Sequence, residues 1–303
     1  MTAFRLRKSA VVTAEALAEA VGGSVVGDAA MTIDGVCSLD ASRSGALAFV
    51  KGAAFLKGRD PTTEGVLLLV PRGEDLGLKG TVIEVDDPRL AFALVCERFF
   101  VERPQPGIDP GASIHPTAKV ASSAVIGAGC VIGPDVEIGE GTELRCNVVI
   151  GPRVKIGAGC LVKSNTVIGE EGFGVVKTAE GHNMRIPHFG SVVIGDGVEL
   201  GSLNTVASGT IDPTRIGDRV KTDDHVHIAH NCVIGEDTII TACAELSGSV
   251  TVGRDVWIGP NASIINGATL ADGVFLGLGA VVTKSLPEKG VYAGAPARLL
   301  RKL

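Results

Sequence analysis

Three of the six histidines of this chain fall within the segment "HVHIAH", at His225, His227 and His230. An imidazole with an ordinary pKa of about 6.5 can accept a proton or bind a metal ion at neutral pH. Residues of this type at this spacing allow three interpretations: a catalytic base with polar neighbours, a metal site, or a polar surface turn. The elements that carry the segment decide among them.

The segment belongs to a long repeat of six residues. Aliphatic side chains occupy every sixth position over 114–168, 194–206 and 216–282, and Thr222 is the one polar exception. Six residues turn an α-helix by about 600°, so an α-helix would not keep these positions on one face. A parallel β-helix does, because each hexad forms a short strand and a turn, and each inward residue stacks on its counterpart three hexads away. We predict a parallel β-helix over residues 113–290.

The repeat is interrupted twice. Residues 170–193 form an excursion from the β-helix, and a shorter insertion surrounds "TIDPT" at 210–214. Loops that leave a rigid scaffold are common places for binding and catalytic residues. The excursion contains Phe173 and His188, so it is a candidate part of a site; the alternative is a loop without function.

Residues 1–102 lack the six-residue period and are typical of a small α/β domain. The segment "TAEALAEAVGG" predicts a helix capped by Thr13 and ended by Gly22, and "DDPRLAFALVCERFF" predicts a second helix with Pro88 in its first turn. The apolar runs "GVLLLV" and "GTVIEVDD" predict short buried strands. A Pro-rich linker at 103–112 separates this domain from the β-helix.

The composition argues against several classes of protein. The formal net charge is −6 and basic residues do not cluster, which disfavours binding to nucleic acid. No apolar run reaches the roughly 18 residues of a membrane span, and the first residues lack the apolar core of a signal peptide. The seven cysteines show no CxxC spacing and are typical of reduced thiols. We expect a cytoplasmic protein without a membrane span.

Several motifs follow one another in a characteristic order. The segment "DDPRLAFA" precedes "GASIHPTAKV", which opens the repeat; "VIGEEGFG", "RIPHFGSVVIGDGVELG" and "DDHVHIAHNCVIGEDTIITACAELSGSVTVG" come after it. Over nearly the full chain this order resembles the UDP-3-O-acylglucosamine N-acyltransferase family of lipid A biosynthesis. The resemblance implies a left-handed β-helix and a homotrimer with its active sites in grooves between neighbouring β-helices.

The resemblance also assigns a role to His230, which matches the general base of the family. The chemistry agrees, because an amine that attacks a thioester must lose a proton, and a neutral imidazole can take it. Asp223 matches an acidic residue of the family motif and is expected to orient an imidazole. The alternative is a surface histidine at a turn.

Further candidates surround this position or match other parts of the family pattern. His227 stands where the family often has Gln, and it is expected to form hydrogen bonds in the acyl-donor groove; a solvated turn is the alternative. The substrate-binding candidates are Phe49, Phe173, His188, Asp224, His227 and Asn231.

The donor is expected to be a pantetheine thioester. Backbone N–H groups of the coils can hold the thioester oxyanion, and Gly248 is a donor-binding candidate. The C-terminal tail at 291–303 contains "AGAPAR", which resembles the ending of acetyl-CoA-dependent members, and there Arg298 and Arg301 are candidates for binding a phosphate. The alternative for both arginines is a solvated basic tail.

The chain departs from the family pattern at two other places. In the front domain, "LAFVKGAAF" replaces a uridine-binding stretch like "SFLANPKY": Phe49 matches the aromatic residue, but Gly52 and Phe55 replace Asn and Tyr. Phe49 can still stack on a base, and plain core packing is the alternative. A later histidine of the family is absent, since "SIINGATL" has Asn266 there.

We therefore predict an N-acyltransferase that moves a 3-hydroxyacyl group from an acyl carrier protein to the amine of a UDP-linked amino sugar. One alternative is an acetyl-CoA-dependent N-acetyltransferase of another nucleotide-linked amino sugar. An alternative from a different class is a zinc carbonic anhydrase of the left-handed β-helix type, with His225, His230 and His188 as ligands. The favoured function needs no metal and no cofactor, because the acyl-carrier-protein or CoA thioester is a co-substrate.

Overall fold

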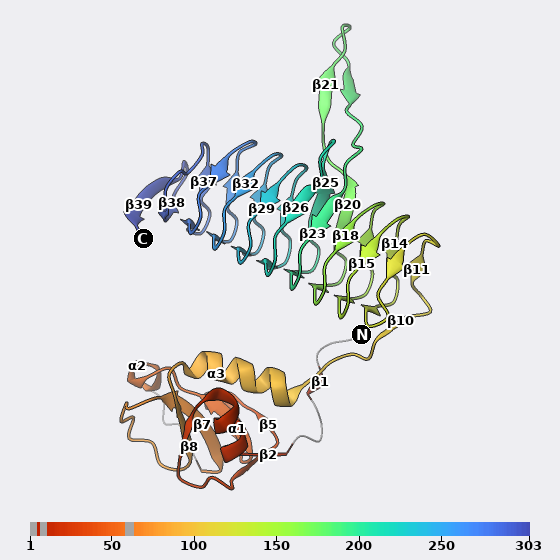
Figure 1. Cartoon of the computed structure of the whole chain (residues 1–303). Helices are drawn as coiled ribbons and strands as arrows, with labels where there is room; N and C mark the ends of the chain where they lie inside the picture. Colours follow the sequence, from red (N-terminus) through yellow and green to blue (C-terminus); the bar gives the residue numbers. More distant parts are fainter. Residues whose placement is uncertain (1–4, 7–10, 58–63) are drawn as a thin grey trace. The chain divides into compact units, whose positions relative to one another are not determined.

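The computed structural model describes residues 5–6, 11–57 and 64–303. They divide into two compact units with the boundary between Pro104 and Gln105, inside the predicted linker. The first unit is a small α/β domain and the second a left-handed parallel β-helix, which confirms the predicted fold (Figure 1). None of the described helices has the length and apolar character required to cross a membrane.

The first unit is built on a five-stranded sheet in the order β3-β8-β7-β6-β5, in which β5 to β8 run parallel and β3 is antiparallel to β8. Its strands are β3 (Ser24–Val26), β5 (Gly35–Val36), β6 (Ala46–Phe49), β7 (Val66–Pro71) and β8 (Val82–Val85). The short pairs are β1 (Arg5–Leu6) with β9 (Val101–Glu102) and β2 (Val12–Thr13) with β4 (Thr32–Ile33). The predicted apolar run "GVLLLV" becomes β7, which is buried along nearly its whole length because a parallel strand is covered on both faces.

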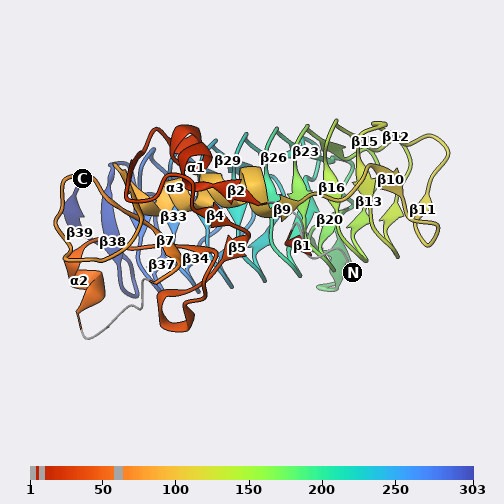
Figure 2. The same ribbon diagram turned by 90° about the horizontal axis from the view of Figure 1, so that it is seen from below.

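The two predicted helices of this unit are present; the first has the predicted ends, and the second ends as an α-helix at Val95 and continues as a π-helical turn to Phe100. Helix α1 (Ala14–Val21) is capped by Thr13, whose Oγ1 accepts a hydrogen bond from the Ala16 N–H at 3.3 Å, and ends at Gly22 with φ 64°. Helix α3 (Pro88–Val95) packs beside α1 (Figure 2). The remaining helices are α2 (Ala53–Leu56), a 3₁₀ turn (Leu39–Ala41) and a π-helical turn (Cys96–Phe100).

The β-helix has three sheets, one on each side of a triangular coil, and their strands run parallel except for β39 (Arg298–Lys302). The eleven-stranded sheet contains β10 (Gly107–Ile108), β13 (Val125–Ile126), β16 (Glu143–Leu144), β19 (Leu161–Val162), β24 (Glu199–Leu200), β27 (Lys221–Thr222), β30 (Ile239–Ile240), β33 (Trp257–Ile258), β36 (Phe275–Leu276), β38 (Gly290–Ala293) and β39 (Arg298–Lys302). The nine-stranded sheet contains β11 (Ser113–Ile114), β14 (Val131–Ile132), β17 (Val149–Ile150), β20 (Val167–Glu171), β25 (Thr205–Ser208), β28 (His227–Ile228), β31 (Glu245–Leu246), β34 (Ser263–Ile264) and β37 (Val281–Val282). The eight-stranded sheet contains β12 (Lys119–Val120), β15 (Glu137–Ile138), β18 (Lys155–Ile156), β23 (Val192–Ile194), β26 (Thr214–Ile216), β29 (Val233–Ile234), β32 (Thr251–Val252) and β35 (Thr269–Leu270).

The predicted inward ladder is the core of the β-helix. Ile114 pairs with Ile132, and the register resumes across the excursion, where Ile156 pairs with Ile194. Thr222, the polar exception, is buried but satisfied, because its Oγ1 accepts hydrogen bonds from the Gly201 N–H at 3.0 Å and from the amide of Asn204.

Two boundaries differ from those predicted. The β-helix starts within the predicted linker at β10, because Ile108 is in hexad register with Ile114. The predicted tail at 291–303 is a β-hairpin: β38 extends the eleven-stranded sheet parallel to β36, and β39 returns antiparallel to it. Buried Tyr292 anchors β38 to the core, which explains why this segment is ordered.

The excursion at 170–193 is also a β-hairpin. Its strands β21 (Val175–Lys177) and β22 (Asn183–Arg185) pair antiparallel and project away from the β-helix (Figure 1). The chain leaves the nine-stranded sheet through β20 and returns to the eight-stranded sheet at β23. The hairpin therefore replaces an ordinary turn at one corner of the β-helix.

Candidate active site

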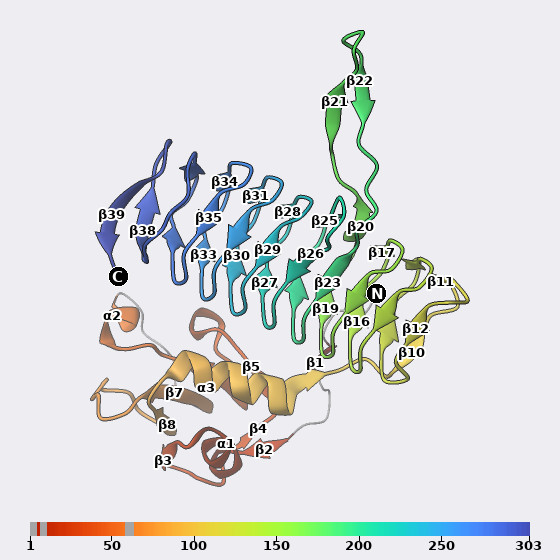
Figure 3. The same cartoon turned by 45° about the horizontal axis from the view of Figure 1, so that its top comes forward.

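The turn between β28 and β29 leads from the nine-stranded to the eight-stranded sheet (Figure 3). His230 lies in this turn, two residues after Ile228. The third residue after an inward aliphatic residue often adopts the left-handed conformation, and Asn231 does so with φ 60°. Asn tolerates this region better than most residues. The turn thus places the half-buried His230 and Asn231 side by side, and the His230 Nδ1 lies 3.0 Å from the Asn231 Oδ1.

The short insertion at 210–214 fixes the orientation of the Asn231 amide. The Asn231 Oδ1 accepts hydrogen bonds from the backbone N–H of Thr210 at 3.1 Å and from its hydroxyl at 3.0 Å. The Asn231 Nδ2 donates to the carbonyl of Asp212 at 3.2 Å. Because Oδ1 can only accept, the His230 Nδ1 must carry the hydrogen, and the Nε2 keeps its lone pair. The network therefore selects the tautomer that a general base requires at Nε2.

Two glycines allow the close packing around His230. A Cβ at Gly248 would lie 2.6 Å from the His230 Nε2 and 2.5 Å from its Cε1. The carbonyl of Gly248 accepts a hydrogen bond at 2.8 Å from the amide of Asn266, in the orientation that satisfies both ends of that amide. On the other side, a Cβ at Gly172 would lie 2.8 Å from the His230 Cβ. The imidazole is held between two backbone segments that tolerate no side chain.

His188 lies behind His230. The two ring centroids are 5.4 Å apart in an edge-to-face arrangement, and the His188 Nδ1 donates to the carbonyl of Ile186 at 2.9 Å. Only 7% of His188 is exposed, and its Nε2 has no hydrogen-bond partner among the described residues. His188 does not line the cavity in front of His230. The His188 ring is buried next to Gly172, Gly174 and His230, and its contact with substrate stays a prediction.

A cavity of about 540 Å³ opens in front of His230. Its lining residues come from β20, β25, β28 and β31 and the turns that follow them: Val167, Glu170, Glu171, Gly172, Phe173, Thr205, Val206, Ala207, His227, Ala229, His230, Glu245, Ser247, Gly248 and Asn266. Phe173 stands at this cavity with 88% of its surface exposed. The structure thus brings His227, His230, Gly248 and Phe173 together, as the sequence predicts.

The outward side chains of neighbouring strands form a polar row along one wall. Thr205, His227 and Glu245 pair in sequence across β25, β28 and β31. The His227 Nδ1 lies 2.6 Å from the Thr205 Oγ1, and the Ser247 hydroxyl donates to the Glu245 carboxylate at 3.1 Å. Sequence reasoning missed Thr205 and Glu245, although the hexad register places both beside His227.

Cys232 is the thiol nearest in sequence to His230. It points into the core, and burial raises the pKa of this thiol to about 11. Its Sγ donates to the carbonyl of Ser247 at 3.3 Å. A protonated, buried thiol is not a nucleophile, so the chemistry at this site depends on the imidazole.

Asp223, Asp224 and His225 lie at another corner of the coil. They form the turn between β27 and β28, whereas His230 follows β28. Within the chain Asp223 therefore does not orient His230, whose Nδ1 is bonded to Asn231. Asp224 accepts a hydrogen bond from the Ser202 N–H at 2.6 Å and stabilises its own corner instead of facing the cavity. No cluster of three His, Cys, Asp or Glu suited to a metal ion occurs in the described part of the chain.

The predicted phosphate ligands are far from His230 along the chain's own β-helix. Arg298 and Arg301 lie on β39, five strands beyond β27 in the eleven-stranded sheet, roughly 24 Å away at about 4.8 Å per strand. Both side chains are exposed, and Arg298 donates to the carbonyl of Ala297 at 3.1 Å.

Phe49 is the predicted base-stacking residue of the first unit. Its ring packs against Phe92 with a centroid distance of 5.0 Å, and it faces Phe55 at 6.4 Å with only 14° between the planes. Phe49 thus packs on the core beside Phe92 and forms a nearly parallel pair with Phe55.

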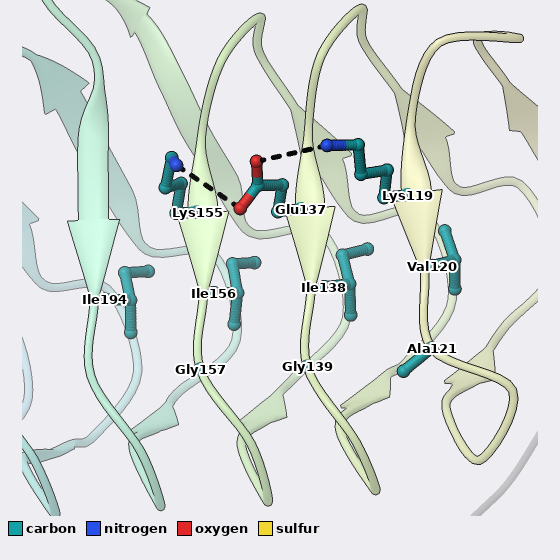
Figure 4. Close-up of a pocket in the computed structure, with 10 residues that line it drawn as sticks. All are labelled: Lys119, Val120, Ala121, Glu137, Ile138, Gly139, Lys155, Ile156, Gly157 and Ile194. Atoms are coloured by element: carbon teal, nitrogen blue, oxygen red, sulfur yellow. Dashed lines mark ion pairs between the residues drawn. The ribbon is translucent and has the colours of Figure 1, made fainter.

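A second cavity of about 510 Å³ lies on the eight-stranded sheet (Figure 4). The Glu137 carboxylate there lies 3.8 Å from the Lys119 Nζ and 3.3 Å from the Lys155 Nζ. The charged side chains of this second cavity are paired with one another, and none of the predicted site residues lines the cavity. The cavity at His230 is therefore the candidate active site.

Comparison with known proteins identifies the repeat and the family of the chain. Residues 135–170, 213–248 and 249–284 match the family model described as bacterial transferase hexapeptide (six repeats). Among solved structures, the β-helix is similar to UDP-N-acetylglucosamine O-acyltransferase from Moraxella catarrhalis, with a TM-score of 0.58, 28% identity, and coverage of 63% of this chain and 73% of that chain.

The similarity to curated sequences extends over both units. The UDP-3-O-acylglucosamine N-acyltransferase of Delftia acidovorans is 36% identical over 91% of this chain and 84% of its own length. The enzyme of the same name from Pseudomonas aeruginosa is 34% identical, with coverage of 93% and 84%. Neither the zinc carbonic anhydrase nor the acetyl-CoA alternative is favoured by these relatives. This chain belongs to the UDP-3-O-acylglucosamine N-acyltransferase family of hexapeptide-repeat acyltransferases.

Proposed function

We propose that this enzyme transfers a 3-hydroxyacyl group from acyl carrier protein to the amine of a UDP-3-O-acylglucosamine, with His230 as general base. The observation that carries the proposal is the 3.0 Å contact between the His230 Nδ1 and the Asn231 Oδ1: because that oxygen accepts, we infer that Nδ1 donates and that the lone pair of a neutral ring lies on Nε2. The relatives' name supplies the acceptor, and an acyltransferase of this kind needs a base that takes the amine proton.

The reaction follows from the groups in the cavity. The amine attacks the thioester carbonyl, and the His230 Nε2 takes a proton from the amine. The backbone of Gly248 packs closely against the His230 ring, and its N–H is proposed to stabilise the oxyanion of the tetrahedral intermediate. Collapse of the intermediate breaks the C–S bond, and the imidazolium returns its proton to the thiolate. No metal and no redox cofactor takes part.

The nucleotide is proposed to bind to the first unit. Phe49 and Phe55 are nearly parallel with their centroids 6.4 Å apart. A planar base is proposed to stack on the face of one of these rings. The loss of the family's Asn and Tyr at this stretch makes stacking, rather than hydrogen bonding, the main contribution of these residues.

The assembly is proposed to be a homotrimer in the cytoplasm, as the resemblance implies. The eleven-stranded sheet has an outward row of apolar residues in Ile239, Trp257 and Phe275, each more than one-third exposed. The Trp257 and Phe275 rings are stacked, with a distance of 5.8 Å between their centroids. Such a row supports contact between copies of the chain. In this assembly, Arg298 and Arg301 are proposed to bind the phosphate of a carrier's pantetheine arm or of CoA.

The test uses purified protein, a 3-hydroxyacyl carrier protein and UDP-3-O-acylglucosamine, with product detected by mass spectrometry. We expect N-acylated product from the wild-type enzyme and at least a thousandfold lower kcat for His230→Ala with unchanged melting temperature. Acetyl-CoA in place of the carrier protein should give no product. A fully active His230→Ala variant would refute the role of the imidazole.

A further inference from the structure

The cavity in front of His230 has an unusual charge. Three of its lining residues are the acids Glu170, Glu171 and Glu245, and none is Lys or Arg. Glu171 forms an ion pair with Arg185 of the excursion, so its charge is compensated. The remaining charge disfavours phosphate groups in this cavity and favours a cation.

Glu245 is the acid best placed to act on a substrate. It occupies the outward position of β31, paired with His227 on β28, and its neighbour Leu246 is buried in the core. The Ser247 hydroxyl donates to both of its carboxylate oxygens, at 3.1 and 3.4 Å. No basic side chain forms an ion pair with Glu245 among the ion pairs of the described residues. The carboxylate is therefore oriented within the cavity and retains capacity for a cationic ligand.

We propose that Glu245 binds the acceptor's amino group as its ammonium ion, and that it determines the preference of this enzyme for an amine over a hydroxyl acceptor. This inference rests on the proposed function, because it concerns the same cavity and the same acceptor. A hydroxyl group in the position of the amine has no charge, so it gains no ion pair with the carboxylate.

The ammonium loses two protons during the reaction, and Glu245 and His230 each accept one of them. The ammonium gives one proton to the Glu245 carboxylate, which leaves a neutral amine and a carboxylic acid. The amine attacks the thioester, and the His230 Nε2 takes the second proton. The imidazolium protonates the leaving thiolate, and the carboxylic acid releases its proton to solvent. The products are the amide, the free thiol and one proton.

The first experiment compares two acceptors that differ only in bearing an amino or a hydroxyl group at the acylated carbon. We expect Glu245→Gln to lower kcat/KM for the amine by about tenfold or more and to leave any transfer to the hydroxyl analogue unchanged. The control is Glu137→Gln, because Glu137 has the same outward hexad position on the eight-stranded sheet and lies outside the site (Figure 4). This variant should behave as wild type.

The second experiment does not require turnover. Binding of the amine and hydroxyl compounds is measured by calorimetry on His230→Ala and on His230→Ala combined with Glu245→Gln. We expect the single variant to prefer the amine by about tenfold and the double variant to bind both equally. Equal binding by the single variant, or an amine preference that survives Glu245→Gln, would overturn the assignment of Glu245. Absence of acyl transfer with an intact amine preference would refute the proposed function alone.

Discussion

The Nδ1 of His230 lies 3.0 Å from the Oδ1 of Asn231, and the Asn231 amide is itself held by Thr210 and Asp212. The catalytic tautomer is thus determined by the insertion at 210–214, which departs from the repeat. Asn231 combines two properties that few residues share, because it accepts a hydrogen bond and tolerates the left-handed turn conformation.

These two properties of Asn231 can be separated by mutation. Both Asn231→Gly and Asn231→Ala remove the acceptor, so we expect each to lower kcat by about 10- to 100-fold with a small change in KM. Only Asn231→Ala places a Cβ without a compensating hydrogen bond at φ 60°, so it should also lower the free energy of unfolding, by about 1 kcal/mol relative to Asn231→Gly. Steady-state kinetics and urea unfolding test both expectations. Wild-type kcat in either variant would show that the anchor is dispensable.

Gly248→Ala should disable the site without unfolding the protein. The new methyl group would lie 2.6 Å from the His230 Nε2, so the imidazole has to move. We expect a loss in kcat of at least a hundredfold. The control is Gly111→Ala, whose Cβ meets nothing closer than 3.3 Å and whose backbone is not left-handed. Equal activity of the two variants would contradict the close packing described for His230.

Replacement of His188 should affect stability and activity in opposite directions. Its buried Nε2 lacks a partner among the described residues, and such an atom costs about 1–3 kcal/mol. His188→Leu should therefore keep or raise the melting temperature. It should lower kcat, because the ring edge that packs against His230 is lost. A variant that loses stability while retaining full activity would reverse this interpretation.

Cys232 should resist alkylation and contribute to alkaline unfolding. Burial raises the pKa of its thiol from 9.0 to about 11, so iodoacetamide should modify it about 100-fold more slowly than an ordinary thiol below pH 9. Since the folded-state pKa is raised, this thiol's contribution to stability is fully present below about pH 9 and is lost as the pH rises through about 11. Peptide mapping and melting curves on Cys232→Ala and wild type between pH 8 and 11 check this. Rapid labelling at pH 8 would contradict the burial.

The hexad register allowed the fold to be predicted because a β-helix repeats one local environment many times. Thr222, the exception, could not be explained from sequence, since its partner Asn204 belongs to the preceding coil. The separation of Asp223 from His230 could have been predicted from the repeat. Asp223 lies in the turn after inward Thr222, and His230 lies in the turn after inward Ile228, so the two residues are at consecutive corners of the coil.

The cavity was predicted less completely than the fold. The position of Glu245 in the cavity could have been predicted from the hexad register, because Glu245 is the outward residue next to His227 on the neighbouring strand. The burial of His188 could not have been predicted, because the path by which the excursion returns depends on the hairpin rather than on the hexad. The placement of a residue in hexad register could be predicted from the sequence. The placement of a residue in an insertion could be determined only from the structure.

The hairpin of β38 and β39 has a consequence for assembly. A parallel β-helix resembles a linear polymer whose last coil presents an unpaired strand edge, onto which another chain can add. At this end of the eleven-stranded sheet the last strand runs in the opposite direction and carries Arg298, Arg301 and Lys302. A strand added to this edge would meet reversed strand polarity and the side chains of Arg298 and Arg301, whereas the charge of Lys302 is paired with Glu288. The hairpin therefore gives this edge of the eleven-stranded sheet an antiparallel strand in place of one more parallel coil.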